Sequence, residues 1–436
     1  MPYDIILGRD KSDKVKFGNN GLIYLGKGYV TMGNYTSLSN KILMDVARSH
    51  VILVAGKRGS GKSYSIATIA EELSTLPPEI SANIAPLIFD TMGIFWTMKY
   101  ENKKEQDLLD KWSLKTREIA VRVFIPHGKS AEYSEKKIPF DEKFALSSSE
   151  LSAEDWLSIF NLEMTSKEGT IITSIISNLK SKKQNFSLNE IFEEINKTSR
   201  ADKESIDSVN SLFSAADEWG IFSKETEGTK ITDLIKGGQT TILDLSTYSS
   251  IGAFNVRAML IGIISRKLFE QRMEARKKEE LQSLNRGQDY LSYATKRDNP
   301  LIWLFIDEAQ EFLPRDGKTP ATEALVQLLR EGRQPGISMV LATQQPGKIH
   351  TDVMTQSDIV IAHRITSEQD IKALNEIMQS YVYSTIQQKM DELPDAKGSA
   401  IVLDDNSERI YSIQVRPRFT WHGGESPSAV KAETKL

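Results

Sequence analysis

The sequence contains no cysteine, which excludes disulfide bonds, thiolate zinc sites and cysteine nucleophiles. It also has no apolar run long enough to cross a bilayer, because the best candidates, 51–55 and 301–306, have only the length of strands. The first ten residues, MPYDIILGRD, show neither the basic nor the apolar part of a secretory signal. These absences predict a soluble, cytoplasmic protein that does not act in a membrane.

A positive net charge is missing as well. The 436 residues carry a formal net charge of −4, whereas proteins that coat DNA nonspecifically are usually basic. Any contact with DNA is therefore expected from a local basic surface, such as loops that line a channel. We interpret the most charged stretch, 272–299, as a solvated helix end followed by a mobile loop, with a DNA-binding helix as the alternative.

Short runs of apolar and β-branched residues recur along the chain, separated by helical stretches. Most of these runs do not alternate with polar residues, which is typical of strands covered on both faces, so they predict an α/β fold with a mostly parallel sheet. Two more runs, 399–403 and 409–415, are expected to form an antiparallel edge. The strands of the parallel part are expected at 51–55, 86–90, 121–125, 240–245, 301–306, 338–343 and 358–362.

Some segments depart from this alternation of strands and helices. Near the N-terminus, short runs at 5–7, 22–25 and 29–32 are punctuated by glycine and predict a small β-rich segment. Further on, apolar residues recur at helical spacing after possible capping boxes that begin at Ser152 and Ser187. The expected division is a β-rich segment at 1–47, a first core part at 48–146, a helical insertion at 147–236, a second core part at 237–422 and a disordered tail at 423–436.

The segment Gly56-Lys-Arg-Gly-Ser-Gly-Lys-Ser63 matches the phosphate-binding pattern G-x-x-x-x-G-K-[ST]. It follows the strand 51–55 and precedes a helix expected at 64–73, which is the context that the motif requires. Glycines let backbone amides turn toward phosphate oxygens, and the helix N-terminus adds a partial positive charge. We expect Lys62 to bind the β- and γ-phosphates of ATP and Ser63 to offer its hydroxyl to Mg²⁺. The expected nucleotide-binding residues are Gly56, Lys57, Arg58, Gly59, Ser60, Gly61, Lys62, Ser63 and Tyr64.

The apolar strand 301–306 ends in two carboxylates, Asp307 and Glu308. Asp307 lies at the edge where open α/β sheets bind ligands, so we expect it to hold Mg²⁺ through water. Glu308 can orient the water that attacks the γ-phosphate. Gln344 ends the next strand, and we expect it to sense the γ-phosphate or that water. Standing alone, these residues would indicate an acidic turn and a turn-forming amide.

The transition state of phosphoryl transfer spreads negative charge that an arginine usually stabilises. Arg330 and Arg333 end an expected helix, and Arg364 follows a strand. If a neighbouring subunit presented one of them, hydrolysis would depend on ring assembly. Alternatively, each complements a helix C-terminus or the rim of the sheet. Asp90, which ends a further strand, is a candidate for positioning Lys62 or the water.

Five motifs stand in the sequence in this order: HVILVAGKRGSGKS at 50–63, FIDEAQ at 305–310, LREGRQPGIS at 329–338, ATQQP at 342–346 and RPRFTWHGG at 416–424. With them the sequence resembles the HerA-like branch of the HerA/FtsK superfamily of DNA-pumping ATPases. The resemblance implies a RecA-like P-loop core, a hexameric ring around double-stranded DNA and translocase or helicase activity. It also implies a partner nuclease or effector, in DNA repair or antiviral defence. By the same resemblance the functional positions are Lys62, Ser63, Asp307, Glu308, Gln344 and Arg333.

The family's N-terminal β-barrel, which often docks the partner, is shortened here to about fifty residues. In such rings, loops beyond the catalytic strands project into the pore. We therefore expect contacts with DNA phosphates from Arg315, Lys318, Lys348 and His350, with exposed loop charges as the alternative for each. The main hypothesis is a DNA translocase. The alternatives are an ATP-switched module that assembles a partner effector and a secretion-type or conjugative motor.

Overall fold

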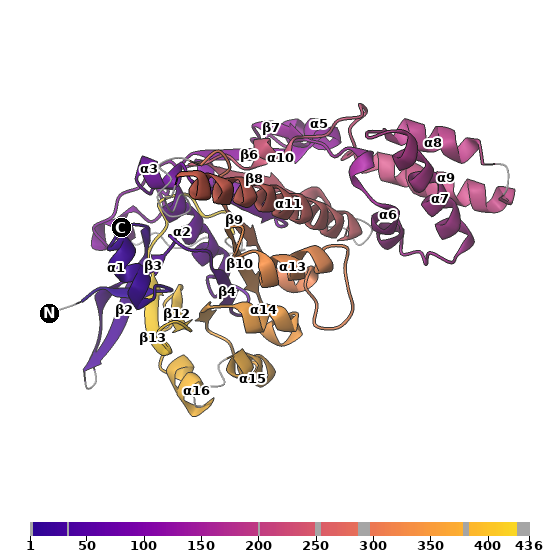
Figure 1. Ribbon diagram of the computed structural model, residues 1–436. Coiled ribbons are helices and arrows are strands. Elements are labelled where there is room, and N and C mark those ends of the chain that lie inside the picture. The colour runs from indigo at the N-terminus through magenta and orange to yellow at the C-terminus, as the bar shows by residue number, and fades with distance from the viewer. Residues whose placement is uncertain are drawn as a thin grey trace.

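The computed structural model describes residues 3–32, 35–198, 201–248, 254–286, 297–377 and 383–424. Within these residues, thirteen strands form one sheet in the order β1-β3-β2-β13-β12-β11-β4-β10-β9-β5-β8-β6-β7. Helices cover both of its faces (Figure 1). From residue 425 onward, the predicted tail lies outside the described part of the chain. The strands are β1 (Ile5–Leu7), β2 (Leu22–Met32), β3 (Tyr35–Asp45), β4 (Val51–Ala55), β5 (Ile84–Asp90), β6 (Val121–Pro126), β7 (Glu142–Phe144), β8 (Thr240–Asp244), β9 (Leu301–Ile306), β10 (Ile337–Thr343), β11 (Ile359–His363), β12 (Ser399–Asp404) and β13 (Arg409–Val415).

The strands from β11 through β4, β10, β9, β5, β8 and β6 to β7 run parallel to their neighbours. Every residue of β5, β8, β10 and β11 is buried, as expected of strands covered on both faces. The predicted α/β fold with a mostly parallel sheet is therefore confirmed. Because these strands point the same way, their C-terminal ends lie on one side of the sheet. The phosphate loop follows β4 on that side.

Strands β12 and β13 are antiparallel, as predicted, but they do not form an edge of the sheet. Strand β13 pairs with β2, and β3 and β1 continue the sheet beyond it. The prediction of an edge is wrong because the pairing partner comes from the opposite end of the chain, which no local pattern reveals. The two runs predicted at 22–25 and 29–32 are one strand, β2, with an irregular register around Gly26, where a side chain would meet Gln414 O at 2.1 Å.

Different helices cover the two faces of the sheet. On one face α2 (Lys62–Ser74) buries Ile66, Ile69 and Leu73 against the strands. The opposite face is covered by α11 (Phe254–Arg286), α13 (Thr322–Glu331) and α14 (Thr351–Gln356). Shorter or peripheral helices are α1 (Lys11–Phe17), α3 (Pro78–Ser81), α4 (Gln106–Lys111), α5 (Ser130–Glu135), α15 (Glu368–Ile377) and α16 (Tyr383–Asp391), with 3-10 turns η1 (Phe95–Lys99), η2 (His127–Lys129), η3 (Ser148–Glu150), η4 (Ser246–Tyr248), η6 (Ala309–Glu311) and η7 (Pro346–Lys348).

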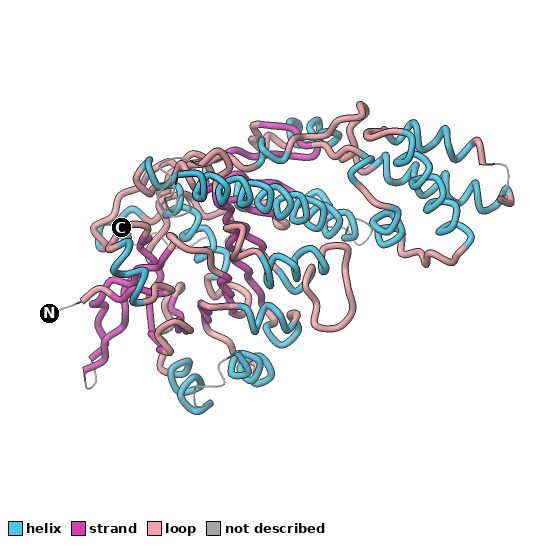
Figure 2. The backbone as a smooth tube through the Cα atoms, viewed as in Figure 1, coloured by secondary structure: helices cyan, strands magenta, loops and turns pink. Residues whose placement is uncertain are grey.

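A helical lobe projects from one end of the molecule, and Figure 2 shows helices and loops there. Its helices are α6 (Ala153–Phe160), α7 (Lys167–Lys182), α8 (Leu188–Asn196) and α9 (Lys203–Glu218), and α10 (Ile231–Leu234) leads back to the sheet. Both predicted capping boxes are present; for example, the Asp155 amide donates to Ser152 Oγ at 3.0 Å. The segment between the two core parts is therefore helical, and the boundaries at 147 and 236 stay a prediction.

The charged end of α11 is only partly solvated. Arg272 is buried, donates to Pro335 O at 2.8 Å and pairs with Glu279 at 3.4 Å. The prediction of a solvated face is wrong at this residue, because its guanidinium holds the turn that leads into β10. By contrast, Glu274 and Lys278 form an exposed pair one helical turn apart. The loop predicted to follow the helix lies, at 287–296, outside the described residues.

Candidate active site

The phosphate loop joins β4 to α2, which begins at Lys62, two residues before the predicted start. Gly61 precedes the helix with a φ of 117°, a conformation that glycine adopts without strain. At Gly56 a Cβ atom would lie 2.5 Å from Ser60 Oγ, so the loop has no room for a side chain. Among the described residues no side chain caps α2, so its first amides remain available to an anion. The other loop residues predicted to bind nucleotide are exposed or half-buried: Lys57, Arg58, Gly59 and Ser60.

Lys62 lies in the loop's concave side with only 6% of its surface exposed. Its Nζ donates to Lys57 O at 3.3 Å. Burial lowers the pKa of Lys62, and the negative charges of Glu308 and Asp307 act against that shift. The lysine of the loop and the two carboxylates after β9 therefore lie in one site, although their catalytic roles stay predictions.

Ser63, at the start of α2, and Asp307, after β9, bring two side-chain oxygen atoms together. Ser63 Oγ donates to Asp307 Oδ2 at 2.7 Å. Burial raises the pKa of Asp307, which is 3% exposed, and the hydrogen bond from Ser63 acts against that shift. A hydroxyl and a buried carboxylate suit Mg²⁺, which prefers oxygen ligands and keeps several waters. These two residues fit the cation that the sequence predicts.

Glu308 adopts a left-handed backbone conformation, with a φ of 52°. Such conformations cost a residue other than glycine about 1–3 kcal/mol and cluster at functional sites. The carboxylate of Glu308 accepts hydrogen bonds from Gln344 Nε2 and, at 2.8 Å, from Gln310 Nε2. Gln310 is in turn fixed by Thr343 Oγ1, which donates to its Oε1 at 2.7 Å. Two amides therefore set the direction in which this carboxylate points.

Gln310 is a site residue that the sequence analysis does not single out. It lies in the motif FIDEAQ, but its spacing from Glu308 carries no chemical signal by itself. Its position becomes meaningful only when β9 and β10 pair, because Thr343 at the end of β10 then meets it.

Asp90 does not contact Lys62 among the described interactions, so the suggestion that it positions Lys62 is wrong, whereas a role in positioning the water stays a prediction. Two strands, β10 and β9, lie between β4 and β5. The carboxylate of Asp90 instead accepts backbone amides of the turn that follows it, at 2.7 Å from Gly93 and 2.7 Å from Phe95. Burial, with the charge of Asp244, raises the pKa of Asp90 to about 7.

Arg333 lies beyond the N-terminal end of β10, at the edge of the sheet opposite the phosphate loop. There it lines a cavity with Arg272 and Arg297. The seven residues of β10 separate the two edges by roughly 23 Å. Arg333 therefore cannot reach the phosphate loop of its own chain. Its action on a neighbour's site stays a prediction that this position permits.

The other two candidate arginines are engaged in ion pairs. Arg330 is 60% exposed and pairs with Asp352 of α14 at 2.8 Å. The carbonyl of Arg364 accepts the Lys57 amide at 3.2 Å, so its backbone lies beside the phosphate loop. The guanidinium of Arg364 turns elsewhere, toward Asp395 and Leu393 O. In this structure neither side chain meets the carboxylates after β9.

The structure brings two of the four predicted DNA contacts together. Arg315 and Lys348 line one cavity of about 430 Å³, and the Arg315 amide donates to Lys348 O at 2.8 Å. Lys318 instead forms an exposed pair with Glu323 at 3.0 Å. His350 caps α14, because its Nδ1 accepts the Asp352 amide at 3.2 Å.

His363 is a second residue without a role in the sequence analysis. It ends β11, is fully buried and lies against Gly56 of the phosphate loop. Burial lowers the pKa of His363 to about 4, so the ring is neutral at pH 7. Its Nδ1 faces Ser399 O at 3.0 Å and therefore carries the proton, because a carbonyl only accepts. Ser65 Oγ then donates to Nε2 at 2.9 Å.

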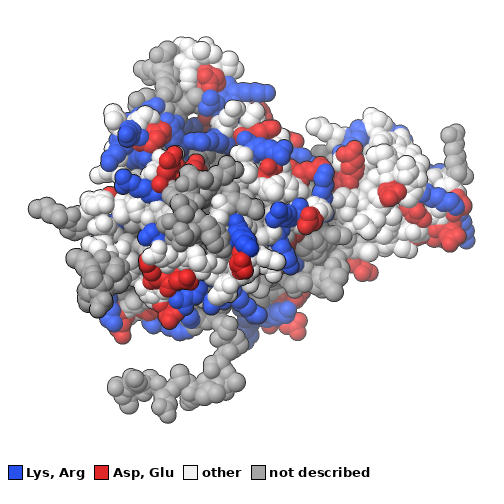
Figure 3. All heavy atoms as spheres, turned by 90° about the horizontal axis from the view of Figure 1, so that it is seen from below, with Lys and Arg blue, Asp and Glu red and all other residues white. Residues whose placement is uncertain are grey.

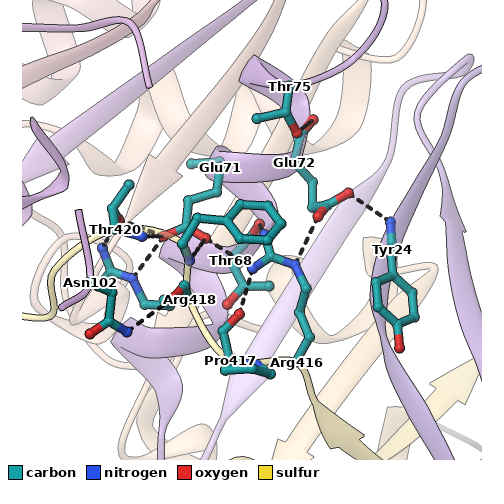
Figure 4. A network of polar contacts seen from close by, with 12 residues as sticks. Tyr24, Thr68, Glu71, Glu72, Thr75, Asn102, Arg416, Pro417, Arg418 and Thr420 are labelled. Carbon is teal, nitrogen blue, oxygen red and sulfur yellow. Dashed lines mark hydrogen bonds and ion pairs between the residues drawn. The ribbon is translucent and has the colours of Figure 1, made fainter. Parts of the chain in front are cut away.

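The C-terminal segment 416–420 forms hydrogen bonds and ion pairs with α2, as Figure 4 shows. Glu71 of α2 is fully buried and accepts hydrogen bonds from Arg416 Nη1 at 3.0 Å, Arg418 Nε at 3.1 Å and the Thr420 amide at 3.1 Å. Burial alone would raise the pKa of Glu71, but the two guanidinium groups hold it below its ordinary value. The motif RPRFT thus fixes the helix that carries the phosphate loop.

A parallel sheet whose strand β4 leads into this loop, with paired carboxylates directly after β9, places the chain among the P-loop ATPases. A family model described as "Helicase HerA, central domain" matches residues 28–268, which is more than half of the chain. The chain therefore belongs to this family, as its motifs predict. Among the described residues no helix combines the length and the apolar character that a membrane crossing requires.

Two curated relatives carry the same family name. The DNA double-strand break repair helicase HerA of Pyrococcus furiosus is 26% identical over 184 residues, which cover 39% of this chain and 31% of that protein. A probable DNA double-strand break repair helicase HerA of Methanocaldococcus jannaschii is 32% identical over 71 residues, which cover 16% of this chain and 14% of that protein. The matched part of the chain thus spans less than a third of either relative.

A solved structure resembles nearly the whole chain. VirB4 of Thermoanaerobacter pseudethanolicus matches with a TM-score of 0.55 at 13% identity, over 92% of this chain and 97% of that one. At this level of identity the likeness shows the fold alone. It agrees with the α/β P-loop core that the strand order and the phosphate loop define.

Proposed function

We propose that this chain is the subunit of a motor that hydrolyses ATP with Mg²⁺ and moves along double-stranded DNA. The observation that carries the proposal is the placement of Glu308 directly after Asp307, in the same site as Lys62 and held by two amides. A second carboxylate beyond the metal ligand serves an enzyme whose acceptor is water.

The proposal assigns a task to each residue of the site. Lys62 and the first amides of α2 bind the β- and γ-phosphates. Glu308 orients and polarises the attacking water, and Gln344 holds Glu308 and senses the γ-phosphate. Bound by Ser63 and Asp307, Mg²⁺ would neutralise charge on the phosphate oxygens.

The ring and its DNA channel are the finer part of the proposal. We infer a hexamer in which Arg333 of one subunit completes the site of the next, which its distance from its own phosphate loop supports. Arg315 and Lys348 would contact DNA phosphates from the pore. On the face in Figure 3, Lys and Arg of the described residues are interspersed with Asp and Glu, so DNA binding would rest on such local contacts.

The names of the two relatives refer to double-strand break repair. In such a process we propose that the motor acts with a nuclease or a defence effector, as the resemblance in sequence implies. The alternative is a module that uses ATP to assemble such an effector without travelling along DNA.

Turnover of ATP with and without long linear duplex DNA, alongside the mass of the particle, separates these two functions. The motor predicts a hexamer whose ATP turnover rises when duplex DNA is added. Turnover that ignores DNA, together with ATP-dependent binding of a partner, would instead establish the assembly module.

Mixed rings test the sharing of sites between subunits. Arg333→Ala subunits keep an intact phosphate loop, and Glu308→Gln subunits keep an intact arginine. Some interfaces of a mixed ring then hold a complete site, so mixing is expected to restore part of the turnover that each variant lacks. Absence of recovery at every mixing ratio would contradict the sharing of sites.

A further inference from the structure

A charged pair lies beside the proposed hydrolysis site and has no task in it so far. Arg257 of α11 is 7% exposed, and its Nη2 lies 3.3 Å from Glu311 Oε2. Its Nη1 donates to Thr91 O at 3.4 Å. Thr91 follows β5, Glu311 lies in η6 after β9, and these two strands are neighbours in the sheet. One guanidinium therefore joins the C-terminal ends of two adjacent strands.

The pair lies close to the two carboxylates that follow β9. Burial raises the pKa of Glu311, the positive charge of Arg257 acts against that shift, and the negative charges of Glu308 and Asp307 act in the same direction as burial. The backbone links the two glutamates directly, because the Glu311 amide donates to Glu308 O at 2.9 Å. This bond closes the single turn of η6, which starts from Glu308. A contact that holds Glu311 thus also restrains the backbone of Glu308.

The backbone of Glu308 needs such a restraint, because it has a left-handed conformation with a φ of 52°. This conformation is unfavourable for a residue with a side chain and persists only where the surrounding structure fixes it. Gln310 and Gln344 hold the carboxylate of Glu308, and these bonds act on its side chain. The turn that Glu311 closes is the part that acts on its backbone.

Arg257 occupies a place where a positive charge is otherwise unfavourable. It is the fourth residue of α11, and the first turn of a helix favours negative charge. Burial also removes its guanidinium from water, which the pair with Glu311 offsets. An apolar side chain would pack here without either cost, so the charge points to a task in the adjacent site. Further along, Arg266 ties the same helix to Asp155 of α6 at 3.0 Å, which gives Arg257 a rigid base.

We propose that Arg257 and Glu311 are positioning residues for hydrolysis, which hold the turn of η6 so that the Glu308 carboxylate faces the attacking water. The inference rests on the proposed function, because it requires Glu308 to act on that water. Neither residue of the pair needs to contact the nucleotide. Loss of the pair should therefore slow the chemical step and leave the binding of ATP unchanged.

Single-turnover hydrolysis measures the chemical step, and calorimetry measures the affinity for ATP with Mg²⁺. Arg257→Gln and Glu311→Gln each remove one charge of the pair. Each is expected to slow hydrolysis about tenfold or more and to keep the affinity within about twofold of wild type, because only the transition state depends on the direction of Glu308. Glu311, whose side chain is 36% exposed, carries the test if Arg257→Gln does not fold. Wild-type rates in the pair variants would overturn the inference.

Arg266→Gln is the matched control. It removes an arginine of the same helix that pairs with Asp155 of the helical lobe instead. The control is expected to hydrolyse ATP at the wild-type rate. A loss in Arg266→Gln as large as that in Arg257→Gln would mean that any broken ion pair of α11 slows hydrolysis, and this would overturn a specific role for Arg257.

The Glu308→Gln background separates positioning from a general effect on the fold. If the pair acts through Glu308, Glu311→Gln should slow hydrolysis in the otherwise wild-type chain and cause no further loss when Glu308 is already replaced, because groups that act as a unit are not additive. The same fold-loss in both backgrounds would overturn the inference. Hydrolysis by Glu308→Gln alone at the wild-type rate would instead contradict the proposed function itself, and the positioning role with it.

Discussion

Two buried histidines lie at opposite ends of the parallel strands and differ in charge. His50 directly precedes β4, at the N-terminal edge, and His363 ends β11, at the edge that carries the phosphate loop. Burial lowers the pKa of His363 to about 4. Burial acts in the same direction at His50, but the carboxylates of Asp358 and Asp45 raise its pKa to about 9.

The difference teaches that neighbouring groups, rather than burial, decide the charge of each ring. His50 Nδ1 lies 2.6 Å from Asp358, and Nε2 lies 3.1 Å from Asp45, so a charged ring ties the end of β3 to the residue before β11. His363 meets a carbonyl and a hydroxyl instead. The neutral ring of His363 packs against Gly56 of the phosphate loop, where Lys62 already supplies the positive charge.

The largest effect in this comparison is expected from Arg333, which lies at the N-terminal end of the strands and would act on the phosphate loop of a neighbouring subunit. Arg333→Ala should reduce ATP turnover by about 10³-fold with ATP affinity kept, because an arginine supplied in trans stabilises transition-state charge by that order. Arg330→Ala, three residues earlier and at the end of α13, removes an ion pair with Asp352; it is the control and should change turnover little. Steady-state kinetics measure both, and equal turnover in Arg333→Ala and wild type would contradict an arginine in trans.

Removing one carboxylate beside His50 leaves the buried ring with Asp45 as its remaining charged partner. Asp358→Asn is expected to lower the free energy of unfolding by about 2–3 kcal/mol, the scale of a lost hydrogen bond to a charged group. Asp395→Asn breaks the exposed pair with Arg364 and should cost no more than about 1 kcal/mol. Urea denaturation compares the two variants, and equal losses would refute a special role for the network around His50.

The charge of His50 also predicts a pH dependence. Its pKa is raised by folding from 6.5 to about 9, so its contribution is fully present below pH 6.5 and is lost as the pH rises through 9. That contribution is roughly 3 kcal/mol. His363 has a lowered pKa, so its contribution to the free energy of unfolding depends on pH in the opposite direction. That contribution is present above pH 6.5 and is lost as the pH falls toward 4.

Urea denaturation of wild type and His50→Gln at about pH 6.5 and pH 9.5 measures this effect. Wild type should lose about 3 kcal/mol more than the variant over that interval. The same loss in both proteins would show that His50 is not the group that titrates.

The smallest effect is expected under the phosphate loop. Ser65→Ala removes the hydroxyl that donates to His363 Nε2 and leaves a buried acceptor unsatisfied, at a cost of about 2 kcal/mol. Ser211→Ala, at an exposed hydroxyl of α9 that donates to Asp207 O of the same helix, is the control. A stability of Ser65→Ala equal to that of the control would mean that His363 needs no donor.

Local patterns predict much of this molecule. The strand, loop and helix around Lys62 and the carboxylates after β9 follow from short motifs, because each motif and its flanking strand are contiguous in sequence. The antiparallel strands β12 and β13 are also indicated correctly. By contrast, β3 and β7 have no counterpart among the predicted strands, and the partner of β13 comes from residues nearly four hundred positions away.

The parts that escape prediction depend on distant pairing. Glu71 sits on a predicted helix, but its buried carboxylate makes sense only when Arg416 and Arg418 return from the far end of the chain. His363 looks like the polar end of a strand until Ser65 and Ser399 surround it. The far-edge position of Arg333 likewise follows from the direction of β10, which the sequence leaves open.

Single-turnover hydrolysis by Glu308→Gln tests the central claim most directly. The variant should bind ATP with Mg²⁺ as tightly as wild type and hydrolyse it ~10²–10⁴-fold more slowly, because the group that prepares the water is gone. Glu331→Gln, at an exposed carboxylate of α13, should retain wild-type rates. Hydrolysis by Glu308→Gln at the wild-type rate would contradict the account.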